Sequence, residues 1–121
     1  FALVVVLRAS DWSVVETQGA IREMLFPYVP GLLSFREAPV LLEAFAKVQS
    51  RPDAVMIDGQ GIAHPRRLGI AAHVGLWLDV PCMGCAKSRL YGKYKEPGTK
   101  VGDLSPLTAA GGEVVGSAVR T

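Results

Sequence analysis

The chain has 121 residues, half of them hydrophobic and a fifth of them charged. This length predicts one domain, and this balance excludes a disordered, collagenous or coiled-coil chain. The longest apolar run, Phe1–Leu7, is too short to cross a bilayer, and two cysteines exclude a framework of several disulfides. We therefore expect a soluble, cytoplasmic domain with no membrane partner, and a monomer.

Charge is distributed unevenly along the chain. Residues 1–59 have a net charge of −2, residues 60–100 have +5, and the remainder has −1. Isolated carboxylates beside a basic stretch are typical of metal-dependent enzymes that act on a polyanion. An ordinary solvated surface can have the same distribution of charge.

Hydrophobic patterning predicts the elements in chain order. Phe1–Leu7 and Ser13–Gln18 are expected to form a hairpin around a turn at residues 10–12. A helical stripe covers Leu32–Gln49, in which Pro39 is expected to start or kink the helix. The remaining elements are a strand at Ala54–Ile57, a helix at Arg66–Leu76, a strand at Val80–Cys85, a basic loop through Lys100 and a strand at Glu113–Val119. This order predicts an α/β fold with a mixed sheet flanked by helices.

The first candidate site follows the buried strand at Ala54–Ile57. Asp58 comes at the carboxyl end of that strand and precedes Gly59 and Gly61, at the position where open α/β sheets build their sites. Glycines there permit a sharp turn and close approach of a ligand. The alternative is a simple turn in which Asp58 caps a helix.

Glu37 is the second candidate carboxylate. One turn of helix directs it toward the sheet near Asp58, and two converging carboxylates with hard oxygen ligands favour Mg²⁺ or Mn²⁺. A solvated glutamate paired with Arg36 or Lys47 is the alternative.

Other polar residues follow the glycine loop. His64 and the arginines after it are suited to phosphate contacts, and no histidine has a partner at zinc-ligand spacing. Residues 87–95 interleave cations with tyrosines, a composition suited to phosphates and stacked bases. Tyr28, fixed between two prolines, is either a packing anchor or a wedge for a duplex. Cys82 and Cys85 are spaced as C-x-x-C, but a strand directs the two sulfurs to opposite faces, which argues against a redox motif.

Four segments carry a resemblance to a known family. They are Phe26–Glu37, Asp58–Arg66, Leu68–His73 and Ala86–Gly92, and together they resemble endonuclease V, a deoxyinosine-directed repair endonuclease. The resemblance implies an RNase H-like fold and a Mg²⁺-dependent hydrolase, for which Mn²⁺ can substitute. It implies cleavage of the second phosphodiester bond 3′ to deoxyinosine in DNA.

The resemblance also implies roles for residues of this chain. Glu37 and Asp58 match metal-site carboxylates, Lys87 matches a catalytic lysine near the scissile phosphate, and His64 matches a histidine beside the active site. Tyr28 matches the wedge that replaces the flipped base. The expected hypoxanthine pocket consists of Leu33, Gly59, Gly69, Ile70 and Leu90, and the expected contacts to the nucleic-acid backbone are Arg36, Arg66 and Arg89.

Two expected acidic residues of the family are absent, one on a strand before Phe1 and one on a helix after Thr121. We therefore expect residues 1–121 to be a single endonuclease V-like domain that lacks its first strand and its C-terminal helices, and to be inactive alone. The alternatives are a non-catalytic RNase H-like module that binds nucleic acid, and an inosine-specific ribonuclease.

Overall fold

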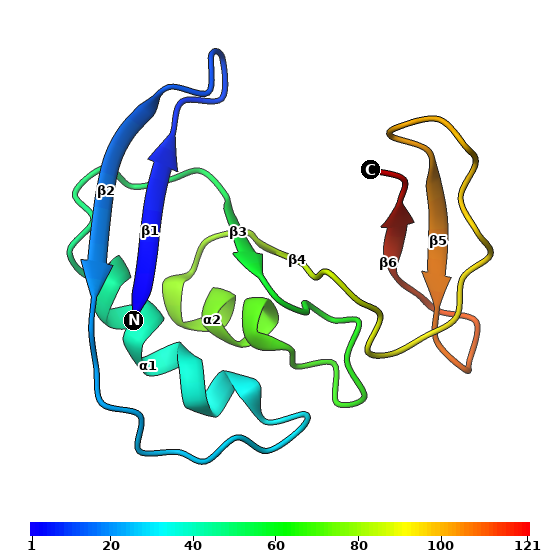
Figure 1. The fold of residues 1–121 in the computed structure, drawn as a ribbon, viewed down its shortest axis with the longest axis horizontal. Coiled ribbons are helices and arrows are strands. Elements are labelled where there is room, and N and C mark those ends of the chain that lie inside the picture. Colours follow the sequence, from blue (N-terminus) through cyan, green and yellow to red (C-terminus); the bar gives the residue numbers. More distant parts are fainter.

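A computed structural model describes all residues 1–121 and shows two helices and six strands (Figure 1). In chain order they are β1 (Ala2–Leu7), β2 (Val14–Ala20), α1 (Leu33–Phe45), β3 (Val55–Asp58), α2 (Ile70–Leu78), β4 (Cys82–Cys85), β5 (Leu104–Thr108) and β6 (Val114–Val119). Neither helix has the length or the unbroken apolar surface that a membrane span requires.

Strand pairing is mixed, as predicted. β1 pairs with β2 and β5 pairs with β6 in antiparallel ladders, whereas β3 and β4 are parallel. The parallel pair is joined by a crossover through α2, the connection that parallel strands require. The pairs form three separate two-stranded ladders, so β1 and β3 each have a free edge.

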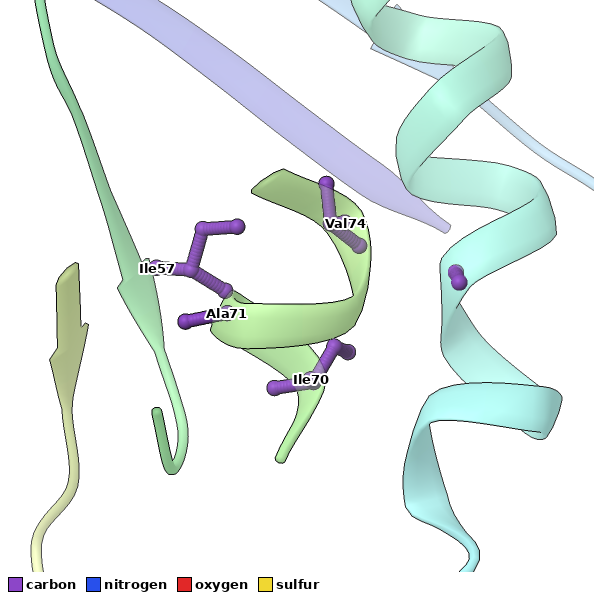
Figure 2. Close-up of a cluster of buried hydrophobic side chains, with 5 residues drawn as sticks. Ile57, Ile70, Ala71 and Val74 are labelled. Atoms are coloured by element: carbon purple, nitrogen blue, oxygen red, sulfur yellow. The ribbon is translucent and has the colours of Figure 1, made fainter. Parts of the chain in front are cut away.

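Two small apolar clusters hold the helices against the first two ladders. Ala44 and Val40 of α1 pack on Ala2 and Ala20 at the ends of the β1–β2 hairpin. In the second cluster, Ile57 of β3 lies against α2, as Figure 2 shows. The alternation along β3 buries Ile57 and leaves Asp58 exposed, because successive strand side chains point to opposite faces.

The β5–β6 hairpin lies beside this body (Figure 1) and has its own cluster. Leu107, Ala109 and Val115 pack with Ala63 from the loop after β3, and Tyr91 and Tyr94 lie against them. A bridge between Lys93 and Thr108 ties the preceding segment to β5.

Three sequence predictions differ from the structure. Pro39 does not start α1, since the helix begins at Leu33 and continues through Pro39, which is exposed. α2 begins at Ile70 and not at Arg66, because Arg67 has a left-handed backbone (φ 56°) and Gly69 is extended. β5 was not predicted, because Pro106 lies within it and proline cannot donate to a ladder.

Candidate functional site

The predicted site residues of α1, the loop after β3 and the loop after β4 line one cavity of about 420 Å³. It receives all four predicted catalytic residues, Glu37, Asp58, His64 and Lys87, together with Tyr28, Leu33, Gly59, Gly69, Ile70 and Leu90. This volume is within the range of small-molecule pockets. Residues far apart in the chain therefore meet at the carboxyl ends of β3 and β4, although the role of each stays a prediction.

The floor of the cavity is a turn of glycines after Asp58. Gly59 has a φ of 145°, and a Cβ on it would lie 2.5 Å from a side-chain carbon of Ile70. A Cβ on Gly69 would overlap the carbonyl oxygens of Gln60 and Gly61, and the Gly69 N–H donates to the Gly61 carbonyl at 2.9 Å. Only glycine permits this approach of two backbone segments.

Asp58 and Lys87, which both line the cavity, form an ion pair. Lys87 Nζ donates to Asp58 Oδ2 at 2.8 Å, and both side chains are largely exposed. The hydrogen bond and the charge of Asp58 raise the pKa of Lys87 above its ordinary value. A protonated lysine at this place is suited to a phosphoryl oxygen. Asp58 does not cap α2, since the cap residue is Gly69 and no side chain caps the helix.

Glu37 lies one turn after Leu33 on the same face of α1, and both line the cavity. It forms no ion pair with Arg36 or Lys47, which donate instead to the Phe26 carbonyl and the Gly19 carbonyl. The Glu37 carboxylate therefore has no ion-pair partner in the chain, whereas the Asp58 carboxylate is paired with Lys87. This excludes the plain solvated pairing considered for Glu37.

Glu37 and Asp58 also line a second, larger cavity of about 1000 Å³, here called the groove. The groove lies between β1 and β3 and has Val40 and Leu41 of α1 among its lining residues. The two carboxylates thus stand where the cavity and the groove meet. Their oxygen donors suit Mg²⁺ or Mn²⁺, but no group of three or more His, Cys, Asp or Glu side chains that could hold a metal ion occurs in the chain.

His64 is buried at the edge of the cavity. Its Nδ1 accepts a hydrogen bond from the Arg66 N–H at 3.1 Å, which fixes the ring proton on Nε2. A Cβ on Gly31 would lie 4.0 Å from Nε2, so this nitrogen lies near the loop that carries Tyr28.

The predicted backbone-contact arginines do not line the cavity. Arg36 donates to the Phe26 carbonyl at 3.1 Å, and Arg89 lies over the ring of Tyr94 at 5.7 Å. Arg66 is exposed. Tyr91 is likewise covered, by Arg67 at 5.2 Å. Tyr91 and Tyr94 pack on the β5–β6 hairpin and are partly buried, so one side of each ring is covered, and a role in base stacking stays a prediction.

The two cysteines are free thiols. Cys82 pairs in register with Val55 and is partly buried, which raises the pKa of its thiol. Cys85 is exposed opposite Asp58. The absence of a bond between them agrees with their predicted placement on opposite faces of a strand.

Sequence reasoning missed several cavity residues. They are Pro30, Gly31, Ser34, Gln60, Leu68, Ala86 and Ser88. Gln60 had a signal in the sequence, because a long polar side chain between two glycines at the end of a strand is placed beside a site of the kind predicted for Asp58. Ser34 had none, since a serine in a helical stripe is usually a neutral surface residue.

Comparisons with known proteins decide the family. A model of the endonuclease V family matches residues 1–121. The chain belongs to the endonuclease V family. It is 52% identical over 120 residues to the endonuclease V of Nostoc sp., covering 99% of this chain and 54% of the relative. The predicted resemblance is thereby confirmed.

Solved structures of endonuclease V share the fold. The Bacillus subtilis protein superposes with a TM-score of 0.91 at 34% identity, covering 98% of this chain and 51% of that protein. The Ciona intestinalis protein, in complex with DNA containing an inosine followed by a ribo-adenosine, has a TM-score of 0.80 at 25% identity, with coverages of 98% and 57%. The predicted α/β fold is confirmed, and the chain spans about half the length of the relatives it matches.

Proposed function

We propose that the protein containing this chain is a metal-dependent endonuclease that cuts the second phosphodiester bond 3′ to deoxyinosine in DNA. The observation that carries the proposal is the convergence of Glu37, Asp58 and Lys87 with Tyr28 at one cavity. Family membership and the inosine-containing DNA bound by the Ciona intestinalis relative support the choice of substrate.

The carboxylates of Glu37 and Asp58 would hold Mg²⁺, or Mn²⁺ in its place. When bound, such an ion polarises a phosphate oxygen and lowers the pKa of a bound water. Lys87, already protonated against Asp58, would stabilise negative charge that develops on the phosphoryl oxygens. A third carboxylate is expected from a segment outside residues 1–121, and the groove leaves an open approach to both carboxylates.

The cavity would hold the extruded base. Leu33, Ile70 and Leu90 supply apolar contact, while Gly59 and Gly69 let backbone groups approach the hypoxanthine edge. Tyr28 is exposed on the loop above and would stack in the space that the base leaves. Extrusion costs less for inosine than for a well-paired base, which contributes to selectivity. Arg66 would contact the nucleic-acid backbone, as would Arg36 and Arg89 where they can leave their present partners.

The test compares the full-length protein with the 121-residue chain on a duplex that carries one inosine, with Mg²⁺ and with EDTA. We expect the full-length protein to nick 3′ of the inosine only with Mg²⁺, and the 121-residue chain to be inactive. If neither form nicks while the full-length protein still binds DNA with a steep salt dependence, a non-catalytic binding module replaces the nuclease.

Cleavage of RNA is the second candidate. The DNA bound by the Ciona intestinalis relative has a ribo-adenosine directly after its inosine. Two duplexes that differ only in a deoxy- or ribonucleotide 3′ of inosine would distinguish the substrates. Faster cleavage of the ribonucleotide duplex would favour an inosine-specific ribonuclease, since the 2′-hydroxyl is what tells RNA from DNA.

A further inference from the structure

The segment Ala86–Leu90 carries Lys87 and Leu90 but has little support of its own, whereas Tyr91 directly after it packs on the β5–β6 hairpin. None of its backbone N–H or C=O groups hydrogen-bonds to another backbone group. Residues 86–90 are all exposed. Segments with few buried contacts and no backbone hydrogen bonds are the parts of a fold that move most easily. Something else must hold this segment over the cavity.

Gln60 supplies the one hydrogen bond that the backbone of this segment receives. Its Nε2 donates to the Ser88 carbonyl at 2.8 Å. The backbone of Gln60 is itself well fixed, because its carbonyl accepts from the Ala71 N–H at the start of α2 at 3.0 Å. The two flanking glycines pack closely on Gly84 and Ile70. The side-chain amide of Gln60 therefore joins the rigid glycine turn to the weakly held segment that contains Ser88.

We propose that Gln60 is a positioning residue, which holds Lys87 and Leu90 at the cavity through its bond to Ser88. The ion pair between Lys87 and Asp58 cannot do this alone, since both side chains are exposed and such pairs hold geometry weakly. The consequence for the reaction rests on the proposed function, whereas the anchoring concerns the chain itself.

The first experiment measures backbone motion in the full-length protein with Gln60→Ala. The control is Gln49→Ala, which removes an exposed glutamine whose side chain makes no hydrogen bond within the protein. We expect the amide order parameters of Ser88 and Leu90 to fall from the rigid value of about 0.85 toward 0.6 in Gln60→Ala alone. Unchanged order parameters in that variant would overturn the proposal, whatever the activity.

The second experiment separates positioning from general stability and from direct contact with substrate. We expect kcat on inosine-containing duplex to fall about tenfold in Gln60→Ala with a smaller change in KM, because Lys87 acts on charge formed in the transition state. Thermal stability should match Gln49→Ala. Gln60→Glu keeps the size of the side chain but presents an acceptor to the Ser88 carbonyl, so it should lose as much kcat as Gln60→Ala.

A Gln60→Glu variant with unchanged kcat would show that the hydrogen bond is not the cause and would overturn the proposal. If the unsubstituted protein does not nick inosine-containing DNA at all, the proposed function fails, and the order parameters still decide whether Gln60 anchors the segment.

Discussion

The cavity and the groove share Glu37 and Asp58 but differ in how they are built. Six of the 17 residues that line the cavity are hydrophobic, against 19 of the 26 that line the groove. Bonds within the chain join the loops around the cavity, among them the Asp58–Lys87 ion pair and the Gln60–Ser88 hydrogen bond. The groove is bordered by the free edges of β1 and β3.

Under the proposed function, this difference would separate recognition of the base from metal binding. The loops that would form the proposed base pocket are bonded to one another within these 121 residues. The carboxylates lie at the border of the groove. The unpaired edges of β1 and β3 and the apolar side chains there form a surface on which a further strand can pair. The chemistry is therefore expected to depend on chain outside this segment, and the base pocket much less.

The largest expected effect is on cleavage, and it follows from substitution of a carboxylate that lines both the cavity and the groove. Asp58→Asn in the full-length protein should lower Mg²⁺-dependent nicking by about a thousandfold or more, because metal-ion stabilisation of transition-state charge is worth several kcal/mol. Steady-state cleavage of a single-inosine duplex measures it, and calorimetry with Mg²⁺ measures binding. Asp53→Asn, an exposed aspartate that lines only the groove, is the control. Equal losses in both variants would contradict a metal role for Asp58.

Substitution of Tyr28 tests the proposed role of the cavity in recognising the base. Tyr28→Ala should lower the preference for inosine-containing over inosine-free duplex by about tenfold to a hundredfold, since stacking on one base is worth roughly 1–3 kcal/mol. Mg²⁺ affinity should not change. Tyr28→Phe keeps the ring and should retain the preference. Equal loss of cleavage on both duplexes would count against a wedge.

Gly69 tests whether the cavity depends on backbone packing. Gly69→Ala places a Cβ against the Gln60 and Gly61 carbonyls, and overpacking of this kind costs about 1–3 kcal/mol of unfolding free energy. Gly111→Ala is the control, because nothing lies within 4 Å of the added carbon. Urea unfolding of both variants measures the difference, and equal stabilities would show that the glycine turn can relax.

The two tryptophans test whether the groove is filled in the longer protein. Trp12 lines the groove and Trp77 lies outside it on α2, and both are largely exposed here. With Trp77→Phe as background, Trp12 emission should shift to shorter wavelength in the full-length protein relative to the 121-residue chain. With Trp12→Phe, Trp77 emission serves as the reference. No shift of Trp12 would mean that the groove stays open to water.

The smallest expected effect is on stability, and it concerns Glu16 of β2, outside the cavity and the groove. The Gln18 amide and the N–H groups of Gln49 and Ser50 lower the pKa of Glu16 from 4.5 to about 2. Its carboxylate therefore stabilises the fold above pH 4.5, and this contribution is lost as the pH falls from 4.5 to about 2. The melting temperature of Glu16→Gln should fall less across that window than that of the unsubstituted chain. Parallel curves would contradict the prediction.

Local patterns determined much of this protein. Alternation and turn residues gave the β1–β2 hairpin, where Asp11 accepts hydrogen bonds from the Ser13 N–H and hydroxyl. An acid at the end of a buried strand, followed by glycines, led to Asp58, and the helical period led to Glu37. Motif resemblance supplied Lys87 and Tyr28. These signals are short in range, so the sequence alone carries them.

Tertiary contacts decided the rest. β5 exists because β6 pairs with it despite Pro106, and Tyr91 and Tyr94 turn inward because an apolar hairpin lies beside them. Only the fold shows the partner of Gln60, because the Ser88 carbonyl that its amide reaches at 2.8 Å lies 28 residues away in the chain. The sequence determined which groups are present and how each strand or helix presents them. Only the fold determined which groups meet, because contacts between distant segments depend on packing that no local pattern encodes.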